Sequence, residues 1–329
     1  MNISTVARIL CLGTKQLNYW YKEHLSHYNF DTKTGKWNGD KIALEVDVST
    51  GEVLKEKVVV IVKPENMGTK MAIDDKQIGK DVFTILTNQE SQKIALMVES
   101  IKADELLASM QLLGNQNDKV QSISCDMAPS YLKLCREVWP KATLVIDKFH
   151  VIKYVYDAVQ ELRMEEKKQV LAQMPKGKQK QKSHELFSDL ELLQRSRNLL
   201  NKQKINLGEA QKQIMEQIFD KFPKIKQGYD LAQEFRSWYD KSNCGMAEMA
   251  IERGLFNWYD KVEESKIKPF KSVVKMIEKH EAEIIAYFST KITSAKAERL
   301  NGKIERFLSN NYGTKSKDFF LYRLKGYFA

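Results

Sequence analysis

Three acidic residues that lie far apart in the sequence have surroundings suited to a shared metal site. Asp74 and Asp126 each follow an apolar run typical of a strand, and Glu298 lies in a helical stretch near the C-terminus. Neighbouring carboxylates repel unless a cation neutralises them, and Mg²⁺ and Mn²⁺ prefer hard oxygen ligands. Two such ions about 4 Å apart can activate the attacking oxygen and stabilise the leaving oxygen of a phosphodiester. The three carboxylates therefore predict a site for two Mg²⁺ or Mn²⁺ ions that acts on nucleic acid.

The pattern before residue 150 predicts the elements that position the two aspartates. The predicted elements are three strands over residues 71–73, 82–86 and 94–98, a helix over 104–113, a strand over 120–124, a helix from Pro129, and a strand over 143–146. This order is that of an RNase H-like α/β fold with a mixed sheet. In such a sheet the strand that closes at Asp74 neighbours the strand that closes at Asp126, so we expect their side chains to lie close together.

A long helical stretch separates the sheet from Glu298. We interpret residues 151–290, rich in Leu, Lys, Gln and Glu at helical spacing, as a large all-α insertion between two parts of the core, 70–150 and 291–329. The basic run Pro-Lys-Gly-Lys-Gln-Lys-Gln-Lys within it predicts an exposed turn. Trp238 and Trp258 could stack on an unpaired base, although aromatic residues at helical spacing more often pack in a core.

Residues 1–28 predict a small helical segment of helix-turn-helix type. The apolar residues that we expect on the inner face of its first helix are Val6, Ile9 and Leu10. Lys15 and Lys22 on the second helix could reach DNA, while a plain helical hairpin is the alternative. Residues 29–69 are interpreted as a linker with short strands.

Composition favours a polyanionic partner. Lys and Arg number 53 against 43 Asp and Glu, which gives a net charge of +10 and a pI near 9.1. The sequence contains no apolar run long enough to span a bilayer and does not begin like a signal peptide, so we expect a cytoplasmic protein without a membrane partner. The four cysteines are scattered, with neither a disulfide framework nor a zinc motif.

Basic and polar residues around Glu298 predict a helix that faces DNA. Arg299, Lys303 and Arg306 can meet phosphate groups, and Asn301 lies one turn beyond Glu298. Double-stranded DNA is therefore the expected partner.

Several blocks of the chain resemble bacterial insertion-sequence transposases of the ISL-three family, in particular its Bacteroidetes-type branch. These blocks are residues 64–75 (PENMGTKMAIDD), 124–131 (SCDMAPSY), 139–142 (WPKA), 145–153 (VIDKFHVIK), 259–262 (YDKV), 294–303 (SAKAERLNGK) and 318–324 (DFFLYRL). The likeness covers about residues 60–329. It implies that Asp74, Asp126 and Glu298 are the catalytic DDE set, with Asp75 standing where the family usually has Glu.

The resemblance also implies a function. A DDE transposase of a mobile genetic element binds the terminal inverted repeats of its insertion sequence, cuts DNA, and joins the resulting 3′-OH to target DNA. We expect a homodimer or higher synaptic assembly at the bacterial nucleoid. Asp147-Lys-Phe-His150 resembles an Asp-x-x-His element of related transposases, in which His150 could position a phosphate or a water; a structural histidine is the alternative reading. Two other functions remain open: a catalytically inactive DNA-binding protein derived from a transposase, and an RNase H-like structure-specific nuclease.

Overall fold

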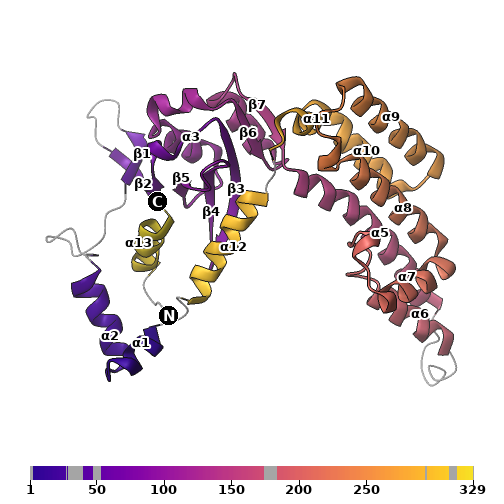
Figure 1. Ribbon diagram of the computed structural model, residues 1–329, viewed down its shortest axis with the longest axis horizontal. Helices are drawn as coiled ribbons and strands as arrows, with labels where there is room; N and C mark the ends of the chain where they lie inside the picture. The colour runs from indigo at the N-terminus through magenta and orange to yellow at the C-terminus, as the bar shows by residue number, and fades with distance from the viewer. Residues whose placement is uncertain are drawn as a thin grey trace. The chain divides into compact units, whose positions relative to one another are not determined.

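The computed structural model describes residues 3–26, 28, 40–46, 53–173, 184–292, 295–310 and 317–328 (Figure 1). The chain divides into two compact units, residues 1–145 with 292–329, and residues 146–291. The insertion predicted over residues 151–290 lies within the second unit. The basic run of residues 175–182, predicted as an exposed turn, lies outside the described residues.

A mixed sheet forms the centre of the first unit, in the order β1-β2-β5-β4-β3-β6-β7. Its strands are β1 (Asp40–Val46), β2 (Val53–Val62), β3 (Lys70–Ile78), β4 (Asp81–Asn88), β5 (Ile94–Val98), β6 (Ser122–Cys125) and β7 (Thr143–Ile146). The pairs β3–β4 and β4–β5 are antiparallel, as the predicted meander requires, and β3 pairs with β6 in parallel. The fold is the RNase H-like α/β fold with a helical insertion that the element order predicts.

Two features of the sheet differ from the expectation. The segment interpreted as a linker contributes β1 and β2, and β2 pairs with β5, so both strands extend the sheet. In addition, Asp74 does not close its strand, because β3 continues to Ile78. The reason is the partner strand: β4 pairs with β3 along its whole length, from Met71↔Asn88 to Ile78↔Asp81, and so keeps the polar half of β3 extended.

Helices cover the two faces of the sheet. On one face α3 (Ala103–Gln111) packs against β5, and α4 (Pro129–Val138) packs against β6. On the other face α12 (Ala295–Asn310) and α13 (Lys317–Phe328) pack on β2, β4 and β5 (Figure 1). Leu300 and Ile304 of α12 are buried there against strand residues such as Ile85. This apolar contact determines how α12 is rotated about its axis.

The N-terminal helices α1 (Ile3–Ile9) and α2 (Thr14–Trp20) pack on each other, and α2 continues as a π-helical turn to Leu25. The prediction that Ile9 and Leu10 lie on the inner face of the first helix is wrong, because their side chains are 62% and 53% exposed. The buried residues of these two helices are Ala7 and Leu17.

The second unit is helical. Its helices are α5 (Lys148–Gln173), α6 (His184–Arg195), α7 (Glu209–Lys221), α8 (Pro223–Trp238), α9 (Glu248–Ser265), α10 (Lys268–Lys279) and α11 (Glu281–Thr290). None of the helices in the described parts of the chain combines the length and apolarity that a membrane crossing requires.

The two tryptophans considered for base stacking belong to the packing of this unit. Trp258 is 3% exposed and its indole N–H donates to the Leu231 carbonyl at 2.9 Å. Trp238 donates to the Ile251 carbonyl at 2.9 Å and packs on Phe235. The stacking role is therefore wrong for Trp258, because a base cannot reach a ring enclosed in the core.

Candidate active site

Asp74 lies on β3, and Asp126 directly follows Cys125, the last residue of the neighbouring parallel strand β6. The register of β3 and β6 pairs Lys70 with Ser122 and Ala72 with Ser124. Continued by two residues, this register puts Asp74 beside Asp126. Because side chains alternate along a strand, an extended continuation of β6 past Cys125 would give positions 74 and 126 the same face of the sheet. The strand pairing thus brings two positions of the chain close together that lie far apart in the sequence.

The face on which Asp74 lies is the one covered by α12. The side-chain amide of Asn301 donates to Asp74 Oδ2 at 2.7 Å, while the backbone N–H of Asp75 donates to Asp74 Oδ1 at 2.8 Å. Further along the same face, Lys76 forms an ion pair with Glu305 of α12. These contacts hold the helix against the polar half of β3.

Glu298 lies in α12 one turn before Asn301, and its side chain is outside the described residues. Residues three apart on a helix share a face. The backbone of α12 therefore presents the position of Glu298 toward the same side as Asn301.

Asp75 points to the opposite face of the sheet. Its Oδ1 accepts hydrogen bonds from the hydroxyl groups of Thr84, at 3.0 Å, and Tyr131. Burial raises the pKa of Tyr131 well above its ordinary value, and the hydrogen bond to Asp75 raises it further. The phenol therefore stays protonated and donates. Asp75 is bound to α4 on one face, while Asp74 is bound to α12 on the other.

The donors beside α12 suit a divalent cation. They are carboxylate oxygens, which hard ions such as Mg²⁺ and Mn²⁺ prefer. Among the side chains that the structure describes, no group of three or more His, Cys, Asp or Glu could hold a metal ion; that of Glu298 is not among them. Mg²⁺ is commonly held by one or two carboxylates together with water and substrate phosphate, so the two aspartates suit such an ion.

His150 lies in the second unit, in the first turn of α5. Asp147 Oδ1 accepts from the backbone N–H of Phe149 at 2.9 Å and so caps the helix, while Asp147 Oδ2 lies 3.0 Å from His150 Nδ1. A buried carboxylate at Nδ1 orients the ring and favours the tautomer with its other nitrogen, Nε2, as an acceptor. This geometry fits an oriented functional histidine as well as a structural one, so the role of His150 stays a prediction.

The basic residues predicted to meet DNA are spread over two elements of the first unit. Lys15 is exposed on α2, whereas Lys22 lies in the π-helical turn with its ammonium 5.3 Å from the centre of the Tyr28 ring. Arg299, Lys303 and Arg306 are exposed on α12. Lys303 and Arg306 line a groove of about 600 Å³ on the first unit.

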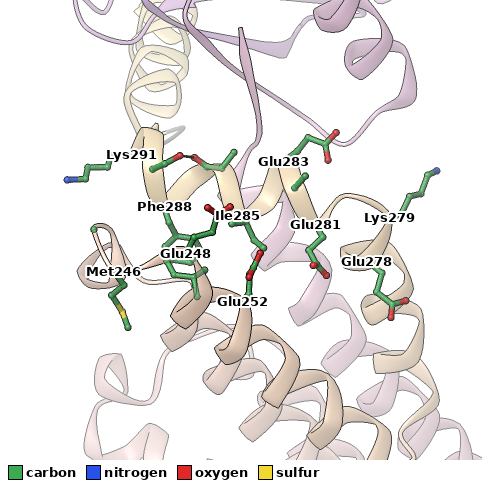
Figure 2. Close-up of a pocket in the computed structure, with 15 residues that line it drawn as sticks. Met246, Glu248, Glu252, Glu278, Lys279, Glu281, Glu283, Ile285, Phe288 and Lys291 are labelled. Atoms are coloured by element: carbon green, nitrogen blue, oxygen red, sulfur yellow. Dashed lines mark hydrogen bonds between the residues drawn. The ribbon is translucent and has the colours of Figure 1, made fainter. Parts of the chain in front are cut away.

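A second groove, of about 860 Å³, lies within the second unit among α9, α10 and α11 (Figure 2). Its charged lining residues are Glu248, Glu252, Glu278, Glu281, Glu283, Lys279 and Lys291. We call this surface the acidic groove. The sequence interpretation missed it, although the i,i+4 spacing of Glu248 and Glu252 was a signal for one acidic helix face. A surface with an excess of carboxylates repels phosphate.

The comparison with protein families identifies the chain. A family model for transposases of the ISL-three DDE type matches residues 71–324. The chain therefore belongs to this transposase family, and the predicted resemblance is confirmed. No curated protein and no solved structure matches the chain. The protein is accordingly an enzyme of DNA transposition that binds and acts on DNA. The matched range contains Asp74, Asp126 and the whole of α12.

Proposed function

We propose that the protein is an active DDE transposase. It binds the terminal inverted repeats of its element, cleaves a strand at each end to leave a 3′-OH, and joins that hydroxyl to target DNA. The observation that supports this proposal is the parallel register of β3 and β6, which brings the part of β3 that carries Asp74 close to the end of β6, directly before Asp126. Two Mg²⁺ or Mn²⁺ ions, when bound, supply Lewis-acid stabilisation of the reacting phosphate oxygens.

Each residue has a defined task in this proposal. Asp74, Asp126 and Glu298 are the metal ligands. Asn301 holds the carboxylate of Asp74 in one orientation through its 2.7 Å hydrogen bond. His150, with its ring oriented by Asp147, positions a phosphate or a water.

DNA binding and assembly complete the proposal. Arg299, Lys303 and Arg306 contact phosphates next to the reacting strand, and the N-terminal helices with Lys15 and Lys22 bind the terminal repeat. The helical insertion clamps the transposon end with surfaces other than the acidic groove. Two ends must be held together, so the working form is a homodimer or a higher assembly. The protein acts in the bacterial cytoplasm, at the nucleoid.

The test compares two glutamates of the same helix. The protein is incubated with labelled terminal-repeat DNA, target DNA and Mn²⁺, as wild type, Glu298→Gln and Glu305→Gln. Joined product is expected from wild type and from Glu305→Gln, whose position contacts Lys76 and not the aspartates. Glu298→Gln is expected to give none.

The other outcomes favour other functions. Equal joining by Glu298→Gln and wild type would remove Glu298 from the site. Cleavage of branched DNA without joining, abolished by Glu298→Gln, would favour the structure-specific nuclease. Binding of terminal-repeat DNA by a wild-type protein that neither cuts nor joins would favour an inactive DNA-binding derivative.

A further inference from the structure

Helix α12 has two polar faces that point in different directions. Asn301 and Glu305 contact β3. Lys303, Arg306 and Asn310 lie roughly 140–200° around the helix axis from Asn301, at about 100° per residue. Leu300 and Ile304 fill the buried side of the helix. The basic residues of α12 therefore lie away from the aspartates, and the structure gives them a separate surface.

That surface is the 600 Å³ groove of the first unit, which combines cations with aromatic rings. Lys303 and Arg306 of α12 line this groove together with Lys93, from the turn between β4 and β5, and Tyr327, from α13. Its lining residues include three cations and no carboxylate. Among the residues with described side chains, none forms an ion pair with Lys303 or Arg306. Its charge therefore complements a phosphate backbone.

Tyr327 is the feature that favours an unpaired strand over a duplex. It is 68% exposed, yet its ring rests on Phe307, at a centroid distance of 5.4 Å, and on Phe328, at 4.8 Å. Two rings thus support one side of Tyr327 and leave its remaining surface accessible. A supported, exposed ring between cations is the arrangement on which unpaired bases stack in proteins that bind single strands.

We propose that this basic-aromatic groove binds a single-stranded DNA segment adjoining the reacting phosphate. Lys93, Lys303 and Arg306 contact its phosphates, Tyr327 stacks on an unpaired base, and the Asn310 amide offers a further hydrogen bond. The groove and the aspartates lie on different sides of one helix, which is roughly 10–12 Å across. The inference rests on the proposed function, since it assigns a strand-binding surface to the same active site.

The test measures binding by fluorescence anisotropy in EDTA, so that no chemistry occurs. The probes are a labelled single strand of about twelve nucleotides and the matching duplex, with the full-length protein. Tyr327→Ala is expected to weaken single-strand binding at least about fivefold, from the loss of one stacked base, and to leave duplex binding unchanged. Tyr327→Phe keeps the ring and is expected to bind as wild type does.

The contribution of the cations to binding is measured separately, through the salt dependence of the affinity. Lys93→Ala and Arg306→Ala should each lower the slope of log affinity against log salt for the single strand by about 0.7, because each releases one fewer counterion. Lys80→Ala, an exposed lysine in the turn between β3 and β4, is the matched control and is expected to change nothing. Unchanged slopes in Lys93→Ala and Arg306→Ala would overturn the inference.

Two further outcomes would also overturn it. Equal weakening of single-strand and duplex binding by Tyr327→Ala would indicate a general DNA contact. A lower oligomeric state of Tyr327→Ala in sedimentation would indicate a contact between copies. The variant Asp126→Asn distinguishes an error in the inference about the groove from an error in the proposed function. If groove variants bind normally while Asp126→Asn abolishes joining, only the groove is rejected. If Asp126→Asn joins DNA like the wild type, the proposed function is rejected.

Discussion

Carboxylates gather in both units of the chain, but in different settings. In the first unit Asp74 lies on β3, and Asp126 follows the neighbouring parallel strand β6. The side-chain amide of Asn301 on α12 donates a hydrogen bond to Asp74. In the second unit five glutamates from three helices surround the 860 Å³ acidic groove (Figure 2). One of these, Glu281, accepts a hydrogen bond from Tyr259 at 3.0 Å.

The difference shows that convergence, and not the number of acidic residues, makes a candidate metal site. Backbone pairing fixes neighbouring strands about 4.8 Å apart, so side chains at matching positions must meet. Glutamates on separate helices around an open groove can turn away from each other into solvent, which weakens their mutual repulsion without a cation. The grooves of the two units also differ in charge, and only the groove of the first unit suits phosphate.

The largest expected effect comes from neutralising a carboxylate of the first unit, compared with the matched change in the second unit. Asp126→Asn should lower the rate of strand joining by about 10³-fold or more, the effect of losing several kcal/mol of transition-state stabilisation. Glu252→Gln, the matched change in the acidic groove, should leave the rate within about twofold. Both rates are measured with labelled terminal-repeat DNA and Mn²⁺. Similar losses in the two variants would show that the acidic groove also takes part in the chemistry.

A smaller effect is expected from the residue that orients Asp74. Asn301→Ala removes the amide donor and should raise the Mn²⁺ concentration needed for half-maximal joining by about 10–100-fold, as loss of a supporting hydrogen bond does at metal sites. Titration of joining activity with Mn²⁺ measures this shift. Ser309→Ala, on an exposed position of the same helix, is the control. An unchanged Mn²⁺ requirement in Asn301→Ala would argue against a role for Asn301 at a metal ligand.

The smallest effect concerns the opposite face of β3. Tyr131→Phe removes a hydrogen bond to Asp75 and should lower the free energy of unfolding by about 1 kcal/mol at pH 8, with joining activity near that of wild type. The pKa of Tyr131 is higher in the folded than in the unfolded protein. The stability advantage of wild type over the variant is therefore complete below pH 10 and declines as the pH rises above it.

Urea unfolding of both proteins between pH 8 and pH 11 measures this difference. A large loss of joining in Tyr131→Phe would mean that Asp75, rather than Asp74 alone, acts at the site.

Much of the fold was predictable because local patterns carry it. The short apolar runs, rich in β-branched and aromatic residues, indicated β3 to β7, and Pro129 indicated the start of α4. The strands β1 and β2 were not recognised as part of the sheet. Their place depends on pairing with β5, a long-range contact that a run of Lys, Gly and Val does not reveal.

The candidate site also has some features that the sequence predicts and others that depend on long-range contacts. The sequence by itself determined the family, the positions of Asp74 and Asp126 after apolar runs, and the helix that carries Glu298. Only the tertiary structure decided that Asp74 rather than Asp75 lies on the face covered by α12, and that Asn301 faces the sheet while Lys303 and Arg306 line a separate groove. The physical reason is that strand register and helix rotation are set by partners distant in sequence, through backbone pairing and the burial of Leu300 and Ile304.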